Sequence, residues 1–69
     1  MQRLLFTITA NDQGWQLYEG IYGSSWFAQF GEARDKAKLL AVTLHEHHGI
    51  PTAVIMDTGR ESVELSRHG

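Results

Sequence analysis

Three of the chain's four histidines lie in one short stretch, LHEHHGIP, from Leu44 to Pro51. Zinc peptidases place two histidines four residues apart, because that spacing puts both side chains on one face of a helix. No such pair occurs here. His45 and His48 lie about 60° from each other around a helix axis and can share a metal ion, whereas His47 points about 160° from His45. A third ligand must come from elsewhere, and His68 is the only other histidine.

The same stretch also has the residues that end a helix. Gly49 stands where a left-handed residue after the last turn is expected, and Pro51 prevents continuation. Histidines near a helix C-terminus interact favourably with its negative end. We therefore favour a structural role and predict no metal or cofactor, with His45 and His48 as the ligand candidates of the metal-binding alternative. His48 continues the apolar stripe of the helix, so we expect it partly buried, with His45 and His47 more exposed.

The carboxylates and serines form no recognisable catalytic set. Asp57 precedes Thr-Gly-Arg, and an Asp in such a loop usually bonds to the backbone of its own turn. Glu61 and Glu64 fall on an expected strand at a spacing that points them to opposite faces, so they cannot work as an acid–base pair. No serine lies in a G-x-S-x-G motif, and the glycines match no nucleotide-binding pattern. The sequence therefore predicts that the chain is not an enzyme.

Aromatic residues crowd the first half of the chain, and an aromatic sheet face can stack single-stranded bases. Such a face needs interleaved basic residues, yet none occurs between Arg3 and Arg34, and the formal net charge is −2. The balance argues against a nucleic-acid partner, which stays an alternative. Packing explains the aromatics better, with Tyr18 and Tyr22 as the best candidates for exposed contacts. The aromatics concerned are Trp15, Tyr18, Tyr22, Trp26, Phe27 and Phe30.

Residue patterns predict five short strands and one helix in the order β-β-β-α-β-β, an α+β fold with the helix packed on a mostly antiparallel sheet. Gly31 is the expected N-cap of the helix. Ala33, Ala37, Leu40, Ala41 and Leu44 follow the spacing of one helical face. The strands are expected at residues 4–10, 15–20, 26–30, 52–56 and 61–66, the helix at 32–48, and turns at 11–14, 22–25 and 57–60.

One helix cannot cover such a sheet. Five strands span roughly 19 Å, whereas a helix with its side chains is about 10 Å across. The far face would carry apolar side chains, including either Ile55 or Met56, and further apolar residues lie on the outer side of the helix. Excess apolar surface often marks an interface. We therefore predict a binding module that forms a homodimer, mainly through the open sheet face, or binds another protein. The predicted interface residues are Leu5, Tyr18, Phe27, Leu39 and Val42.

Length and composition agree with one small domain spanning residues 1–69. The chain has no cysteine, so neither a disulfide nor a thiolate zinc site can stabilise its small core. No apolar run approaches the roughly 20 residues of a membrane span, and the first residues follow no signal-peptide plan. These features predict a cytoplasmic protein without a membrane partner.

A set of short motifs resembles a family of short bacterial proteins that carry only a domain-of-unknown-function label. The motifs are GW-x-L at residues 14–17, F-x-x-A-x-x-x-A at 30–37, a helix ending in Gly49, and D-x-G at 57–59 before a terminal HG. The resemblance runs from Gly14 onward. It departs at Gly31, where a Ser or Thr cap is typical, and at His68, where an aromatic often stands. It implies the fold and a bacterial or phage-type origin, and no activity.

Overall fold

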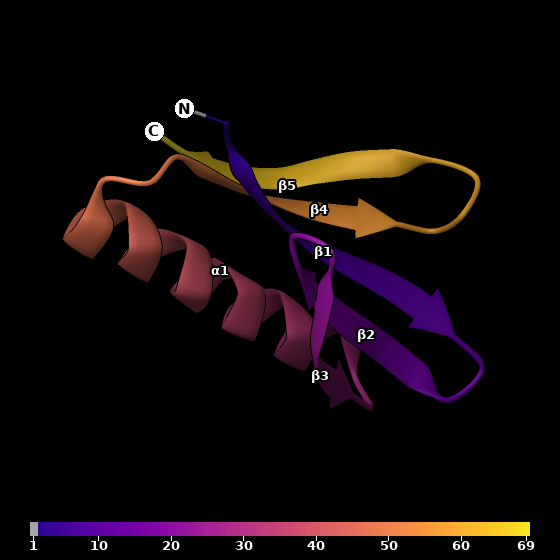
Figure 1. Ribbon diagram of the computed structural model, residues 1–69. Coiled ribbons are helices and arrows are strands. Elements are labelled where there is room, and N and C mark those ends of the chain that lie inside the picture. The colour runs from indigo at the N-terminus through magenta and orange to yellow at the C-terminus, as the bar shows by residue number, and fades with distance from the viewer. Residues whose placement is uncertain (1) are drawn as a thin grey trace.

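The computed structural model describes residues 2–69 and confirms the predicted α+β order (Figure 1). The five strands form one sheet in the order β3-β2-β1-β4-β5, in which all neighbouring pairs are antiparallel except β1 with β4. The predicted, mostly antiparallel sheet is therefore correct. The elements are β1 (Leu4–Asn11), β2 (Gly14–Glu19), β3 (Tyr22–Phe27), α1 (Phe30–His48), β4 (Thr52–Asp57) and β5 (Ser62–His68).

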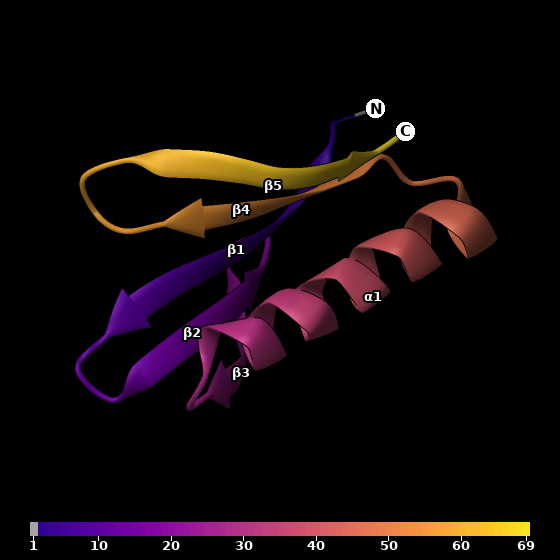
Figure 2. The ribbon, with the colours of Figure 1, turned by 180° about the vertical axis from the view of Figure 1, so that it is seen from behind.

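The parallel pair of β1 and β4 lies at the centre of the sheet. A parallel pair needs a crossover connection, which α1 supplies as it returns the chain along one side of the sheet. Leu4 pairs with Thr52 at one end of the two strands, and Thr9 pairs with Asp57 at the other. Seen from the front and from behind, α1 lies along one side of the sheet, and no second helix among residues 2–69 covers the other side (Figures 1 and 2).

The turn between β2 and β3 is formed by Gly20 and Ile21, so the predicted turn at residues 22–25 is wrong. Gly20 has a φ of 62° and Ile21 a negative φ, a combination that suits a two-residue hairpin turn. Gly23, which indicated a turn in the sequence, instead pairs with Tyr18. A Cβ at Gly23 would lie 3.5 Å from the Tyr18 ring, an ordinary van der Waals contact.

The helix begins two residues earlier than predicted, at Phe30, and the third strand ends at Phe27 rather than at residue 30. Gln29 is the N-cap, with extended backbone and no side-chain cap, and Gly31 lies inside the first turn. The Phe30 ring packs edge-on against Trp15, with ring centroids 5.0 Å apart. This aromatic contact packs the start of α1 against β2.

The core lies between α1 and the sheet. Ala33, Ala37 and Ala41 are fully buried, as the predicted helical face requires, and their small side chains let the helix approach the strands closely. Thr52 is also fully buried, and its hydroxyl donates a hydrogen bond of 2.9 Å to the Ala41 carbonyl. The buried strand residues opposite the alanines are Phe6, Ile8, Leu17 and Val54, and the partly buried residues around them are Leu4, Trp15, Phe27, Phe30, Leu40, Leu44 and Leu65.

Candidate protein interaction surface

The histidine stretch ends α1 as predicted. Gly49 has a φ of 66°, and its N–H donates to the His45 carbonyl at 3.0 Å. The expected burial is wrong, because His48 is exposed with His47, whereas His45 is half-buried. The last turn of α1 extends past the strand ends, so the face that continues the apolar stripe meets solvent there (Figures 1 and 2). His45 lies against Gly69, where an added Cβ would be 3.1 Å from its ring.

The two metal candidates, His45 and His48, gain no third ligand among residues 2–69, where no three His, Asp or Glu side chains are close enough to hold an ion. His68 lies on β5, on the side that faces the helix, opposite Thr52. Its Nε2 atom is buried and has no hydrogen-bond partner among the described residues. The contacts around this stretch therefore favour the helix-terminal role.

Asp57 and Glu61 take part in the backbone hydrogen bonds of the hairpin between β4 and β5. The Asp57 carboxylate accepts a hydrogen bond of 2.8 Å from the Gly59 N–H, which is the turn role predicted for it. Glu61 is exposed, and its carbonyl accepts a hydrogen bond from the Thr58 N–H at the same hairpin. The described part of the chain contains no pocket. The notable surface is the side of the sheet opposite α1.

Residues paired across neighbouring strands point to the same side of a sheet, so the strand registers define this surface. We call the side opposite α1 the open face. Its central row contains Thr7, with Tyr18 beside it on β2 and Ile55 beside it on β4. The row continues to Gly23 on β3 and to Glu64 on β5. A second row is Trp26, Gln16, Thr9, Asp57 and Ser62, and a third is Leu5, Ala53 and Arg67.

Charge is distributed unevenly over the open face. The positions on β1, β2 and β3 carry no charged side chain, whereas Asp57, Glu64 and Arg67 lie on β4 and β5. Leu5 is 42% exposed and Trp26 49% exposed. Three strands thus present an uncharged surface that combines apolar and hydroxyl groups, next to a charged flank.

Leu5 and Tyr18 lie on the open face as predicted, together with Ile55 rather than Met56. Phe27 does not, because it pairs with Trp15 and packs against the core beneath α1. Trp26 takes the expected place of Phe27. The predicted strand began at residue 26, and the observed β3 starts at Tyr22 and contains a bulge, which reverses the side to which each residue points.

The two remaining interface candidates lie on α1. Leu39 is 60% exposed and Val42 is half-buried.

Trp26 is the residue that the sequence reasoning missed. Gly20 alone was not a sufficient signal, because a regular two-residue turn there pairs Gln16 with Ser25, and only the bulge at Ser24 brings Trp26 opposite Gln16.

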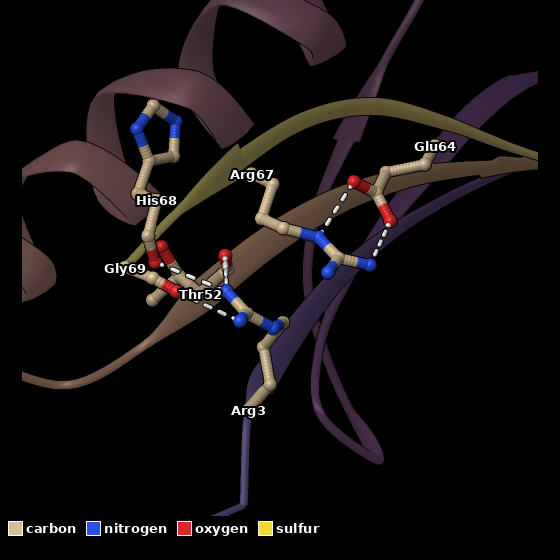
Figure 3. A network of polar contacts seen from close by, with 6 residues as sticks. All are labelled: Arg3, Thr52, Glu64, Arg67, His68 and Gly69. Carbon is tan, nitrogen blue, oxygen red and sulfur yellow. Dashed lines mark hydrogen bonds and ion pairs between the residues drawn. The ribbon is translucent and has the colours of Figure 1, made fainter.

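A bulge in β5 places Glu64 and Arg67 side by side. The register with β4 shifts between Val54 and Ile55, so both charged residues point to the open face. Two hydrogen bonds of 2.8 Å run from the Arg67 guanidinium to the Glu64 carboxylate (Figure 3). These hydrogen bonds lower the pKa of Glu64 and raise the pKa of Arg67. The charged flank is therefore internally paired.

Arg3 closes one corner of the open face. Its guanidinium donates hydrogen bonds to the carbonyls of Thr52 at 3.0 Å, His68 at 3.2 Å and Gly69 at 2.8 Å (Figure 3). These contacts fasten the segment before β1 to the start of β4 and the end of β5. The charge of Arg3 is thus directed to backbone carbonyls within the chain.

Comparison of the chain with protein-family models, with curated proteins and with solved structures finds no match. The resemblance to short bacterial proteins stays a prediction. Among residues 2–69, no helix is both long and apolar enough to cross a membrane.

Proposed function

We propose that this protein is a small binding module that associates with a second copy of itself through the open face. The observation that carries the proposal is the central parallel pair. Sheets built of parallel strands are normally covered on both sides, whereas among residues 2–69 the parallel pair β1 and β4, which lies within a mixed sheet, is covered on one side only, by α1. Where the two strands meet on the open face lie Leu5, which is 42% exposed, the half-buried Thr7 and Ile55, and the fully buried Ala53, all of them uncharged.

The composition of β4 supports the same function. Thr52, Val54 and Met56 point toward α1, whereas Ala53 and Ile55 point to the open face, so the strand is nearly apolar on both sides. Such a continuous apolar pattern is typical of strands buried between two layers. A second copy would supply the missing layer.

The size of the open face predicts a reversible dimer. A sheet about 19 Å wide with strands about 20 Å long offers roughly 400 Å² per copy. A standard interface buries about 800 Å² per partner, so this contact belongs to the weak class. We expect a monomer–dimer equilibrium in the micromolar range rather than an obligate dimer.

Analytical ultracentrifugation over a wide concentration range tests the proposal. The average mass should rise from the monomer value of 7.8 kDa toward twice that value as concentration increases. Thr7→Lys places a charge at the centre of the open face and should abolish the increase. Leu39→Lys is the matched control on the outer side of α1 and should behave like the wild type. A constant monomer mass up to millimolar concentration contradicts the proposal.

A nucleic-acid role receives less support from the surface. Tyr18 and Trp26 could stack on bases, but Arg67, the basic residue within the strands of the open face, is already paired with Glu64. The resemblance from Gly14 onward supports a bacterial origin, and we place the module in the cytoplasm as part of the proposal.

A further inference from the structure

We infer that the two copies pack face to face about a two-fold axis that runs parallel to β1, between their open faces. The inference rests on the proposed self-association and adds its geometry. Two facing sheets whose strands are aligned can be related by an axis along the strands or by an axis across them. The distribution of residues over the open face distinguishes these arrangements.

An axis along β1 exchanges the two halves of the sheet. It places β2 of one copy over β4 of the other, and β3 over β5. Tyr18 and Ile55 flank Thr7 in the central row, so Tyr18 of each copy then covers the partner's Ile55. An aromatic ring on a branched aliphatic side chain is a favourable pair, and the symmetry creates it twice.

The same axis keeps like charges apart. Glu64 of β5 lies opposite the partner's Gly23, since these residues end the central row on either side. Asp57 lies opposite the partner's Gln16, because both belong to the second row. The charged flank of each copy therefore meets the uncharged flank of the other, and the ion pair of Glu64 with Arg67 stays at the rim, where water reaches it.

An axis across the strands is less favourable. It places every strand over the same strand of the partner. An axis through the central row therefore brings Glu64 against the partner's Glu64. Directly opposed like charges destabilise an interface. Shifting the axis by one residue in either direction avoids that contact, but it leaves one outer row beyond the overlap, either the row of Trp26 or the row of Leu5. The smaller contact then loses either Trp26 or Leu5, the two large apolar side chains of the open face that are most exposed.

Single-cysteine variants test the geometry, because the chain has no cysteine of its own. Leu5→Cys and Thr9→Cys lie on the proposed axis, so a short bismaleimide should link each cysteine to the same cysteine of the partner. Most of the protein should then run as a dimer on a denaturing gel. Glu64→Cys lies two strands from β1, so its two copies are separated by about four strand spacings, roughly 19 Å, and should not be linked. Circular dichroism checks that each variant folds.

The experiments distinguish a wrong axis from an absence of self-association. Concentration-dependent dimers in which Glu64→Cys is linked, or in which Leu5→Cys and Thr9→Cys are not, overturn the axis and leave self-association standing. A monomer at every concentration overturns the proposed function. Cross-linking of Leu39→Cys in place of the β1 variants moves the interface to α1 and overturns both. Mixing Tyr18→Cys with Ile55→Cys should give the heterodimer band more efficiently than either variant alone.

Discussion

The two faces of the sheet are built by alternate residues of the same strands, yet they have different compositions. Along β1, Phe6 and Ile8 are fully buried beneath α1, whereas Leu5, Thr7 and Thr9 form the open face. The covered face is made of large apolar side chains that fit three helical alanines. The open face mixes leucine, isoleucine and aromatics with threonine and glutamine. This difference shows that the open face is neither a second core nor an ordinary charged surface.

Removing a large side chain from each face should give the largest difference in the free energy of unfolding. Phe6→Ala opens a cavity beneath α1 and should lower the free energy of unfolding by about 3–5 kcal/mol. The total for a chain of this length is roughly 3–10 kcal/mol, so much of the variant should be unfolded. Leu5→Ala on the open face should lower it by about 1 kcal/mol, since the side chain is partly exposed. Urea denaturation monitored by circular dichroism measures both, and equal losses would refute the contrast.

Replacing threonine by valine on each face sharpens the comparison at constant shape. Thr52→Val removes the buried hydrogen bond to the Ala41 carbonyl and should lower the free energy of unfolding by about 1 kcal/mol. Thr7→Val makes the centre of the open face more apolar. It should leave monomer stability nearly unchanged and should strengthen self-association in the ultracentrifuge. Weaker association of Thr7→Val would contradict the proposed interface.

A third contrast concerns a polar group on the covered face. The Ser66 Oγ atom is buried and has no hydrogen-bond partner among the described residues. Leaving such a group unpaired is unfavourable, so Ser66→Ala should raise the free energy of unfolding by about 1 kcal/mol. Ser62→Ala, at an exposed position of the same strand, is the control and should have no effect. Destabilisation by Ser66→Ala would show that the hydroxyl forms a hydrogen bond in solution.

The smallest effect should come from the charged flank of the open face. Because the pKa of Glu64 lies below its ordinary value of 4.5, its stabilising contribution is present above that value. It is lost as pH falls through the lower pKa of the folded state. The pair is exposed, so salt should weaken the effect further. Comparing wild type with Glu64→Gln at pH 7 and pH 3 measures it, and an equal difference at both pH values would exclude it.

Local residue chemistry was sufficient to predict much of the fold. The end of α1 followed from Gly49 and Pro51, and the strands β1 and β4 followed from their apolar residues. The β2–β3 turn did not follow, because Gly20 and Gly23 are both plausible turn residues, and only pairing with Tyr18 determines their roles. The start of α1 was also missed, since the Phe30 contact with Trp15 depends on tertiary packing.

The candidate surface was predicted where strand alternation is regular. Leu5 and Tyr18 were placed correctly, whereas Phe27 was placed on the wrong side because an error in strand start and an unseen bulge reverse the alternation. The pairing of Glu64 with Arg67 also depends on a bulge that has no signature in the residues themselves. Burial of His48 was predicted wrongly, because helical phase says nothing about where the sheet ends.

The parallel pairing of β1 with β4 also determines the order in which the chain can fold. Leu4 pairs with Thr52, so this pair joins segments much farther apart in the sequence than those joined by the three hairpin pairs. The hairpins of β1, β2 and β3 can form earlier from neighbouring residues, because short loops close quickly. Until β4 arrives, the second edge of β1 has unpaired backbone groups that another chain can pair with. The interval before β4 docks is therefore the stage at which strand exchange between nascent or refolding chains is most favourable.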